Sequence, residues 1–186
     1  MLTLDVGCGC HGVGDVNIDV FRAGMNRQIG NQRCGELVNP HLIENFVVAD
    51  ACFLPFKVNA FDVAYSSHVI EHVKYPFLMV SEMCRVASKE VIIRCPHRRG
   101  SGAKRPFHIN FFDEDWFSKY AEILGYRSTE QITVHDWNIS SRLPFPEHLK
   151  TCLVWRVFKH IERLVLKPNR GVPFELESCI DVRKRE

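Results

Sequence analysis

The sequence predicts an α/β fold in which a mostly parallel sheet is flanked by helices. Short apolar runs typical of buried strands recur along the chain, at 2–6, 46–50, 60–67 and 89–95. Apolar residues at helical spacing lie between or after them, at 76–86 and 114–124. A glycine turn at 7–9 follows the first apolar run directly. Strands that alternate with helices favour a parallel sheet with its ligand site at the carboxyl ends of the strands.

Length and composition fit a soluble globular protein. The 186 residues suit a single domain spanning 1–186, and 25% of them are charged, with a formal net charge of +2. This charge balance gives no indication of a nucleic-acid partner. The chain has no uncharged apolar run of membrane-spanning length, and it begins on a core strand instead of a signal peptide, so we expect a cytoplasmic protein. The eight cysteines form no paired C-x-x-C motifs, which argues against structural zinc.

The first twenty residues predict a pocket for a nucleoside-type cofactor. A buried strand at 2–6, the turn and a short loop lead to a second strand that ends at Asp19. Gly7 and Gly9 allow a sharp turn and close approach of a ligand to the backbone, and an acid at the end of the second strand is placed to hold a ribose diol. Residues 10–16 leave no room for the helix that a dinucleotide pyrophosphate needs. A cofactor without phosphates is therefore favoured over a nicotinamide dinucleotide.

The next segments complete the first half of the expected sheet. Residues 21–45 are expected to be irregular, with at most a short helix near their end. The third strand, 46–50, ends in Asp50 and is followed by a Leu54-Pro55-Phe56 turn. A cofactor contact by Asp50 competes with the plainer interpretation that its side chain caps the following turn.

Histidine and basic residues follow the fourth and fifth strands. The fourth strand, 60–67, leads into His68-Val69-Ile70-Glu71-His72, and the helix 76–86 comes next. The fifth strand, 89–95, leads into Pro96-His97 and a basic loop at 98–105. Asp113 is a suitable N-cap for a helix over 114–124, which Gly125 ends.

The last part of the chain contains two more strands, at 128–135 and 174–182, around a long helical pattern at 146–166. That pattern combines a broad apolar face with five flanking basic residues and a tryptophan. Such a helix could make peripheral contact with a membrane or cap a lipid-like substrate. The commoner alternative is that its apolar face packs on the sheet.

The motif Leu4-Asp5-Val6-Gly7-Cys8-Gly9, read with the later Ser66-Ser67 and Glu71-His72, resembles the class I S-adenosylmethionine-dependent methyltransferases, specifically the type 11-like methyltransferase domain. The resemblance implies a Rossmann-like seven-stranded mixed sheet of order 3-2-1-4-5-7-6, with the last strand antiparallel. It also implies S-adenosylmethionine as cofactor. This chain departs in lacking the first crossover helix and the amino-terminal helices that often cover the substrate.

The same resemblance implies where the cofactor is held. Asp19 would bind the ribose, Asp50 the adenine amino group, and Ala51 and Leu54 would pack against the adenine ring. The complete set of implied cofactor residues is Asp5, Gly7, Cys8, Gly9, Asp19, Val20, Asp50, Ala51, Leu54 and Ser66.

Histidines are the candidates for base chemistry. His97 and His108 lie on the carboxyl side of the expected sheet and could accept a proton from an oxygen or nitrogen acceptor. A metal is a weaker possibility, through His68, Glu71 and His72 on one helical turn, with His97 or His108 as a fourth ligand. Related methyltransferases of quinone precursors and of small-RNA ends carry a similar motif. We expect no metal here, with Glu71 orienting a histidine instead.

Together these features predict a methyltransferase that acts on a small-molecule or lipid-linked acceptor. The alternative is a non-catalytic module that binds S-adenosylmethionine, or a subunit that needs a partner to supply the missing lid. The basic loop 98–105 could hold a phosphate or carboxylate of the acceptor, although a solvated surface loop is the simpler interpretation.

Overall fold

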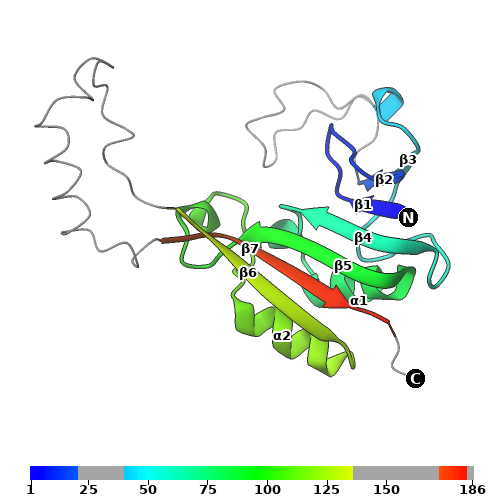
Figure 1. The fold of residues 1–186 in the computed structure, drawn as a ribbon. Coiled ribbons are helices and arrows are strands. Elements are labelled where there is room, and N and C mark those ends of the chain that lie inside the picture. Colours follow the sequence, from blue (N-terminus) through cyan, green and yellow to red (C-terminus); the bar gives the residue numbers. More distant parts are fainter. Residues whose placement is uncertain (21–39, 136–171, 184–186) are drawn as a thin grey trace, which may run out of the picture.

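Seven strands form one sheet in the order β3-β2-β1-β4-β5-β7-β6, as the family resemblance predicted (Figure 1). The computed structural model describes residues 1–20, 40–135 and 172–183. Strands β1 to β5 pair in parallel, whereas β7 is antiparallel to both β5 and β6. The strands are β1 (Thr3–Val6), β2 (Val16–Asp19), β3 (Phe46–Val48), β4 (Phe61–Ser67), β5 (Ala87–Pro96), β6 (Arg127–His135) and β7 (Val172–Asp181).

The predicted absence of a helix between β1 and β2 is confirmed, because residues 7–15 contain none. Parallel neighbours usually require a longer crossover. Here the side-chain oxygen of Asn17 accepts from the Gly14 amide at 3.0 Å, and its side-chain nitrogen donates to the carbonyl oxygens of Gly14 and Glu44. A Cβ at Gly14 would lie 2.7 Å from the Val16 carbonyl oxygen. The short connection therefore depends on glycine and on a buried asparagine that bonds to both sides.

Gly7 fixes the turn after β1 and provides a stability prediction. Its φ is +78°, and an added Cβ would lie 2.3 Å from Cγ2 of Val69. We expect Gly7→Ala to lower the free energy of unfolding by about 2–4 kcal/mol, through backbone strain and overpacking. Urea denaturation of Gly7→Ala, Val69→Ala and the double variant would measure this. Because removing the Val69 methyl groups relieves the clash, the double variant should lose less unfolding free energy than the sum of the two single variants. Strict additivity would contradict the predicted clash.

Helices α1 (Pro76–Val86) and α2 (Glu114–Ile123) lie close to their predicted bounds. Pro76 occupies the first turn of α1, where a missing amide proton costs nothing. The Asp113 carboxylate accepts from the Trp116 amide at 3.1 Å and caps α2 as expected. Gly125, with φ of +79°, ends that helix. Three short 3₁₀ turns complete the described elements: η1 (Pro40–Leu42), η2 (Ile70–His72) and η3 (Ser101–Lys104).

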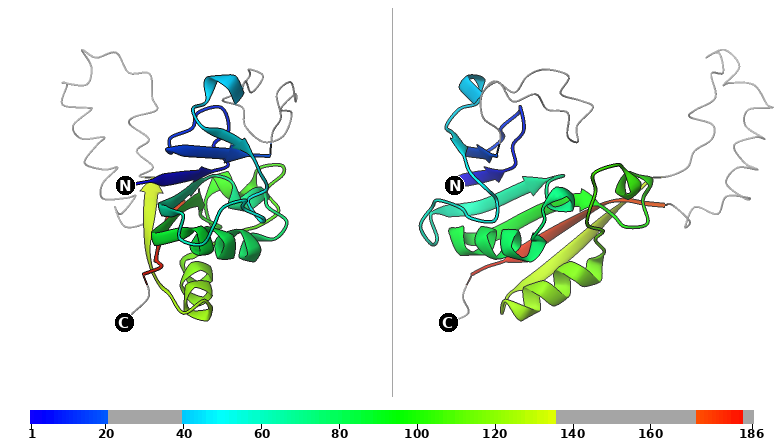
Figure 2. Two further views of the ribbon diagram at one scale, coloured as in Figure 1. Left: turned by 90° about the vertical axis from the view of Figure 1, so that its right-hand side faces the viewer. Right: turned by 180° about the vertical axis from the view of Figure 1, so that it is seen from behind.

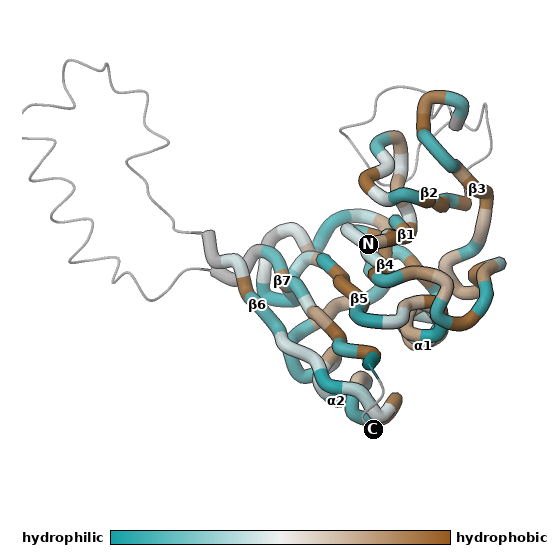
Figure 3. The backbone as a smooth tube through the Cα atoms, turned by 45° about the vertical axis from the view of Figure 1, so that its right-hand side comes forward, coloured by the Kyte–Doolittle hydropathy of each residue, from teal (hydrophilic) through white to brown (hydrophobic). Residues whose placement is uncertain are grey.

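Both helices cover the same face of the sheet, as Figure 2 shows from two sides. Strand β5 alternates accordingly: Val91 and Ile93 are buried in the core, whereas Glu90 and Arg94 point to the opposite face. Figure 3 shows the middle of β5 as a hydrophobic stretch with hydrophilic residues on either side. Within the described ranges, no helix covers the second face, which explains why β5 does not read as a uniformly apolar parallel strand.

Two predicted segments lie outside the described residues: the helix 146–166, and 21–39 of the irregular stretch 21–45. The described end of that stretch contains the short turn η1, as expected. Strand β5 begins two residues earlier than predicted, because Ala87 leaves α1 and pairs at once with Phe61 of β4. Of the helices that the structure describes, none has the length and apolar content needed to cross a bilayer.

Candidate functional site

The carboxyl ends of β1, β2, β3 and β4 meet at one edge of the sheet, because these strands run parallel. The predicted cofactor residues of the first two strands lie there together. Asp19, at the end of β2, is buried, and its Oδ2 accepts from the Gly9 amide at 2.9 Å. Gly7 and Gly9 both have positive φ values. A carboxylate beside a glycine turn without side chains suits a ribose and its adjoining chain, so these residues fit the predicted nucleoside.

Asp5 is a second buried acid behind this turn. Its Oδ2 accepts from the Val13 amide at 3.0 Å, and only 3% of the residue is exposed. Burial raises the pKa of Asp5 to about 6; the Val13 hydrogen bond opposes the shift and the nearby Asp19 adds to it. Asp5 therefore holds the 7–15 connection from within and contributes a group that titrates just below neutral pH.

This raised pKa predicts a pH-dependent stability. Between about pH 4 and 6 the folded chain binds a proton at Asp5 that the unfolded chain has lost, so the free energy of unfolding falls as pH rises. The contribution is about 3 kcal/mol and is complete above pH 6. Asp5→Asn, which retains an acceptor for Val13, should remove this loss. Urea denaturation of the unmodified chain and of Asp5→Asn at pH 5 and pH 7.5 checks this. If the two proteins differ in free energy of unfolding by the same amount at both pH values, the assignment is contradicted.

The turn after β3 carries the residues predicted to contact the adenine. The Asp50 carboxylate accepts from the Cys52 amide at 2.8 Å, so it does cap the turn. Leu54 is only 4% exposed and belongs to the main hydrophobic core, as does the buried Ala51. Phe53, which the sequence analysis did not select, is 68% exposed. It is the aromatic side chain of this turn that a planar base could reach.

The remaining predicted cofactor residues have contrasting environments. The side chain of Cys8 is buried against Ile43. Val20 is exposed just beyond β2. Ser66 is buried, and its hydroxyl donates to the Val6 carbonyl at 2.9 Å, so it links β4 to β1 within the sheet. Its described contact is therefore structural.

Beyond β4, a carboxylate and two imidazoles form a cluster. Among the described residues, Glu71, His72 and His108 each offer a ligand-type atom, and these atoms lie within 4.8 Å of one another. Glu71 is 2% exposed, and neither of its carboxylate oxygens forms a hydrogen bond with a described residue. Nδ1 of His108 is likewise buried without such a partner. Buried polar atoms are normally paired, so this cluster calls for a functional explanation.

The cluster replaces the predicted His68-Glu71-His72 set. His68 has a φ of +57°, and its Nε2 lies 2.9 Å from Glu175 of β7, while its Nδ1 lies 3.4 Å from Glu71. These contacts, first that with Glu71, raise the pKa of His68. His72 stays in the cluster: its Nδ1 lies 3.0 Å from the Phe107 carbonyl oxygen, which can only accept. Nδ1 therefore carries a proton and donates it to this carbonyl.

The two predicted base candidates separate clearly. His97 is 1% exposed, its Nδ1 accepts from the Arg99 amide at 3.2 Å, and its Nε2 lies 3.1 Å from Glu114. With both ring nitrogens engaged, His97 fixes the start of the basic loop and is poorly suited to base chemistry. His108 is partly exposed, and its ring contacts that of His72 edge to face at 4.7 Å. Burial lowers the pKa of His108. The geometry thus favours His108.

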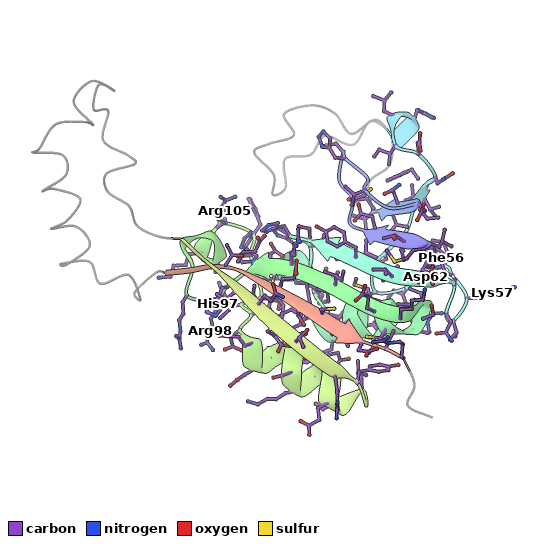
Figure 4. The ribbon with its side chains drawn as sticks, viewed as in Figure 1. Phe56, Lys57, Asp62, His97, Arg98 and Arg105 are labelled. Carbon is purple, nitrogen blue, oxygen red and sulfur yellow. The ribbon has the colours of Figure 1, made fainter. Side chains whose placement is uncertain are left out.

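The basic loop 98–105 lies at the same end of the sheet. Figure 4 shows Arg98 and Arg105 on this loop and Asp62 at the far end of the sheet. Arg98 forms an ion pair with Asp113 at 2.6 Å, and the short turn η3 lies within the loop.

Comparisons with known proteins agree with this geometry. The family model described as a methyltransferase domain matches residues 4–95. The chain is 27% identical over 191 residues to the chloroplastic tocopherol O-methyltransferase of Arabidopsis thaliana, covering 90% of this chain and 55% of that one. It is 32% identical over 110 residues to the tRNA (carboxymethyluridine(34)-5-O)-methyltransferase of Saccharomyces cerevisiae, covering 56% of this chain and 39% of that one. The chain thus spans about half, or less, of the length of these relatives.

Among solved structures, the fold resembles a SAM-dependent methyltransferase of Thermotoga maritima, described as a possible histamine N-methyltransferase. The TM-score is 0.60 at 16% identity, and the match covers 98% of this chain and 82% of the other. This similarity establishes the fold, and the family match spans β1 to β5 except for one residue at each end. Over residues 4–95 the chain belongs to the methyltransferase-domain family, and its fold is that of the class I S-adenosylmethionine-dependent methyltransferases, whose cofactor is S-adenosylmethionine.

Proposed function

We propose that this protein transfers the methyl group of S-adenosylmethionine to an oxygen or nitrogen atom of a small-molecule or lipid-linked acceptor. The observation that carries the proposal is the buried Glu71–His72–His108 cluster just beyond β4, on the strand edge where the family holds its cofactor. The relatives named above methylate chemically different acceptors. We therefore infer the acceptor atom from the cluster, which offers an imidazole to remove a proton from oxygen or nitrogen.

The cofactor residues act by holding a nucleoside, which supplies an activated methyl group when it is bound. Asp19 accepts hydrogen bonds from the ribose hydroxyls, while the turn from Gly7 to Gly9 lets the ligand approach the backbone. Asp50 and the exposed Phe53 ring provide the adenine side of the site. The chain contributes positioning, because an in-line displacement depends mainly on the alignment of its two reacting atoms.

The cluster removes the acceptor proton. His108 is the group that takes it, since its ring is partly exposed and its lowered pKa keeps it neutral at physiological pH. Glu71 stabilises the imidazolium that forms, and the Phe107 carbonyl holds His72 in one tautomer beside it. The same three side chains could instead bind a borderline divalent metal such as zinc. Our proposal is the metal-free arrangement.

Two measurements test the proposal. Calorimetry with S-adenosylhomocysteine and with NAD tests the pocket without an acceptor: we expect binding of the first compound alone. Formation of S-adenosylhomocysteine is then measured with a panel of phenols, prenylated quinols, amines and transfer RNA. Turnover with a hydroxyl or amine compound is expected. If S-adenosylhomocysteine binds but no acceptor is methylated, the non-catalytic alternative is favoured. If only transfer RNA is methylated, the proposed class of acceptor is wrong.

A further inference from the structure

Apolar side chains are exposed on the segment that carries His108. Phe107, Ile109 and Phe111 are 61%, 58% and 55% exposed, and they alternate with inward-facing residues. The surrounding stretch, 98–112, contains four basic residues and no acidic one. We call residues 98–111 the basic–apolar loop. Large exposed apolar groups beside basic ones are uncommon on a monomer surface unless the surface binds something.

The exposure does not result from a loosely attached backbone. The Arg98 amide donates to the Phe112 carbonyl at 2.8 Å, and the Ile109 amide donates to the Glu71 carbonyl at 2.9 Å. The side-chain nitrogen of Asn110 donates to the Val73 carbonyl at 2.7 Å. These bonds fix both ends of the segment, so the three apolar side chains cannot turn inward without breaking them.

Phe107 is held in a strained conformation. Its φ is +74°, a region that bulky residues rarely adopt, and its carbonyl oxygen lies 3.0 Å from Nδ1 of His72. The strain places an aromatic ring in solvent, where it gains no packing within the described structure. Strain of this kind is typical of functional positions, here one that is directly bonded to the candidate site.

The loop also carries positive charge that the described structure does not neutralise. Arg99, Lys104 and Arg105 are exposed, and none of them forms an ion pair with another described residue. Only Arg98 is paired, with Asp113. A partner complementary to this loop is therefore negatively charged at its surface and apolar beneath.

We propose that the basic–apolar loop binds the surface of a membrane that contains anionic lipids. Phe107, Ile109 and Phe111 enter the interfacial region, while Arg99, Lys104 and Arg105 contact the head groups. The inference rests on the proposed function in one respect: it brings the bilayer beside His108, so that a lipid-linked acceptor reaches the base directly from the membrane. An RNA partner fits less well, because Ile109 offers no flat face on which a base could stack.

Co-sedimentation of the full chain with phosphatidylcholine vesicles, with and without phosphatidylglycerol, tests the proposal. We expect binding that requires the anionic lipid and weakens as salt is raised. Phe107→Asn should reduce the partition coefficient by about tenfold; asparagine tolerates a positive φ, so the fold is retained. Lys104→Ala and Arg105→Ala should each reduce it about fivefold. Ile123→Asn and Lys119→Ala on α2 are matched controls, expected to bind as the unmodified chain does.

Vesicle binding that is absent, or equal in all these variants, would overturn the proposal. Loss of transfer-RNA binding in Arg105→Ala, without any vesicle binding, would identify the loop as a nucleic-acid surface instead. Calorimetry with S-adenosylhomocysteine on the same samples separates the failure of the proposed function from the failure of the membrane proposal. If S-adenosylhomocysteine does not bind but the chain still binds anionic vesicles, the proposed function is wrong and the membrane proposal is supported.

Discussion

Asp19→Ala should weaken the binding of S-adenosylhomocysteine by about 10- to 150-fold, which corresponds to roughly 1.5–3 kcal/mol for charge-assisted hydrogen bonds. Asp19 ends β2 at the edge where the parallel strands converge, and it is buried beside the Gly9 amide. We expect this carboxylate to accept from both ribose hydroxyls, and a buried charge-assisted hydrogen bond is poorly replaced by water. Isothermal calorimetry at neutral pH would measure the loss.

Two variants separate a cofactor contact from a structural one. Asp19→Asn keeps an oxygen for the Gly9 amide but removes the charge, so it should fold normally and bind with intermediate affinity. Asp15→Ala removes an exposed carboxylate from the same connection, one that accepts from the Thr3 amide at 2.7 Å. It should leave the affinity unchanged. An unchanged affinity in a folded Asp19→Ala protein would refute the ribose assignment.

Much of the fold could be predicted because its signals are local. Strands β1, β3, β4 and β5 contain short apolar runs, α2 has a capping aspartate and a terminating glycine, and Asp19 ends β2. The order of the strands is not a local property, and it came from the family resemblance. Element bounds were less accurate where pairing decides them. Ala87 and Pro96 enter β5 through contacts with β4 and β7, which the sequence of the strand does not encode.

The candidate site could be predicted only where neighbouring strand ends define it. Asp19 and Gly9 meet because β1 and β2 run side by side. The proximity of Glu71 to His108 depends instead on a loop that returns to η2, where the Ile109 and Asn110 amides donate to the Glu71 carbonyl. His68 leaves the predicted set because a carboxylate on the antiparallel strand β7 attracts it. Such contacts between distant segments carry no pattern in the sequence.

Glu71→Gln should reduce methyl transfer by about 100-fold or more while leaving the protein at least as stable as before. The substitution keeps the shape of the side chain and removes its charge. Both carboxylate oxygens of Glu71 are buried; among the described residues neither accepts a hydrogen bond, and the charged contact of Glu71 is with Nδ1 of His68, 3.4 Å from Oε1. Burial of a carboxylate with so little compensation is unfavourable for folding. Because such a group is costly to the fold, its value must lie in the reaction, where it stabilises the protonated His108 ring. The measurements are kcat with an acceptor identified from the panel, and urea denaturation.

In Glu71→Gln we expect turnover to fall while the free energy of unfolding does not. A purely structural Glu71 would lower stability and turnover together, and that result would contradict the proposed role. Glu175→Gln is the matched control: it removes the other carboxylate that contacts His68, so it should leave kcat unchanged. Chelation distinguishes the two ways in which Glu71 could act. We expect turnover to be indifferent to chelator, as a proton-accepting His108 requires. If turnover falls after chelation and returns when zinc or manganese is added, Glu71 acts with His72 and His108 as a metal ligand, because these are the described side chains close enough to share one ion.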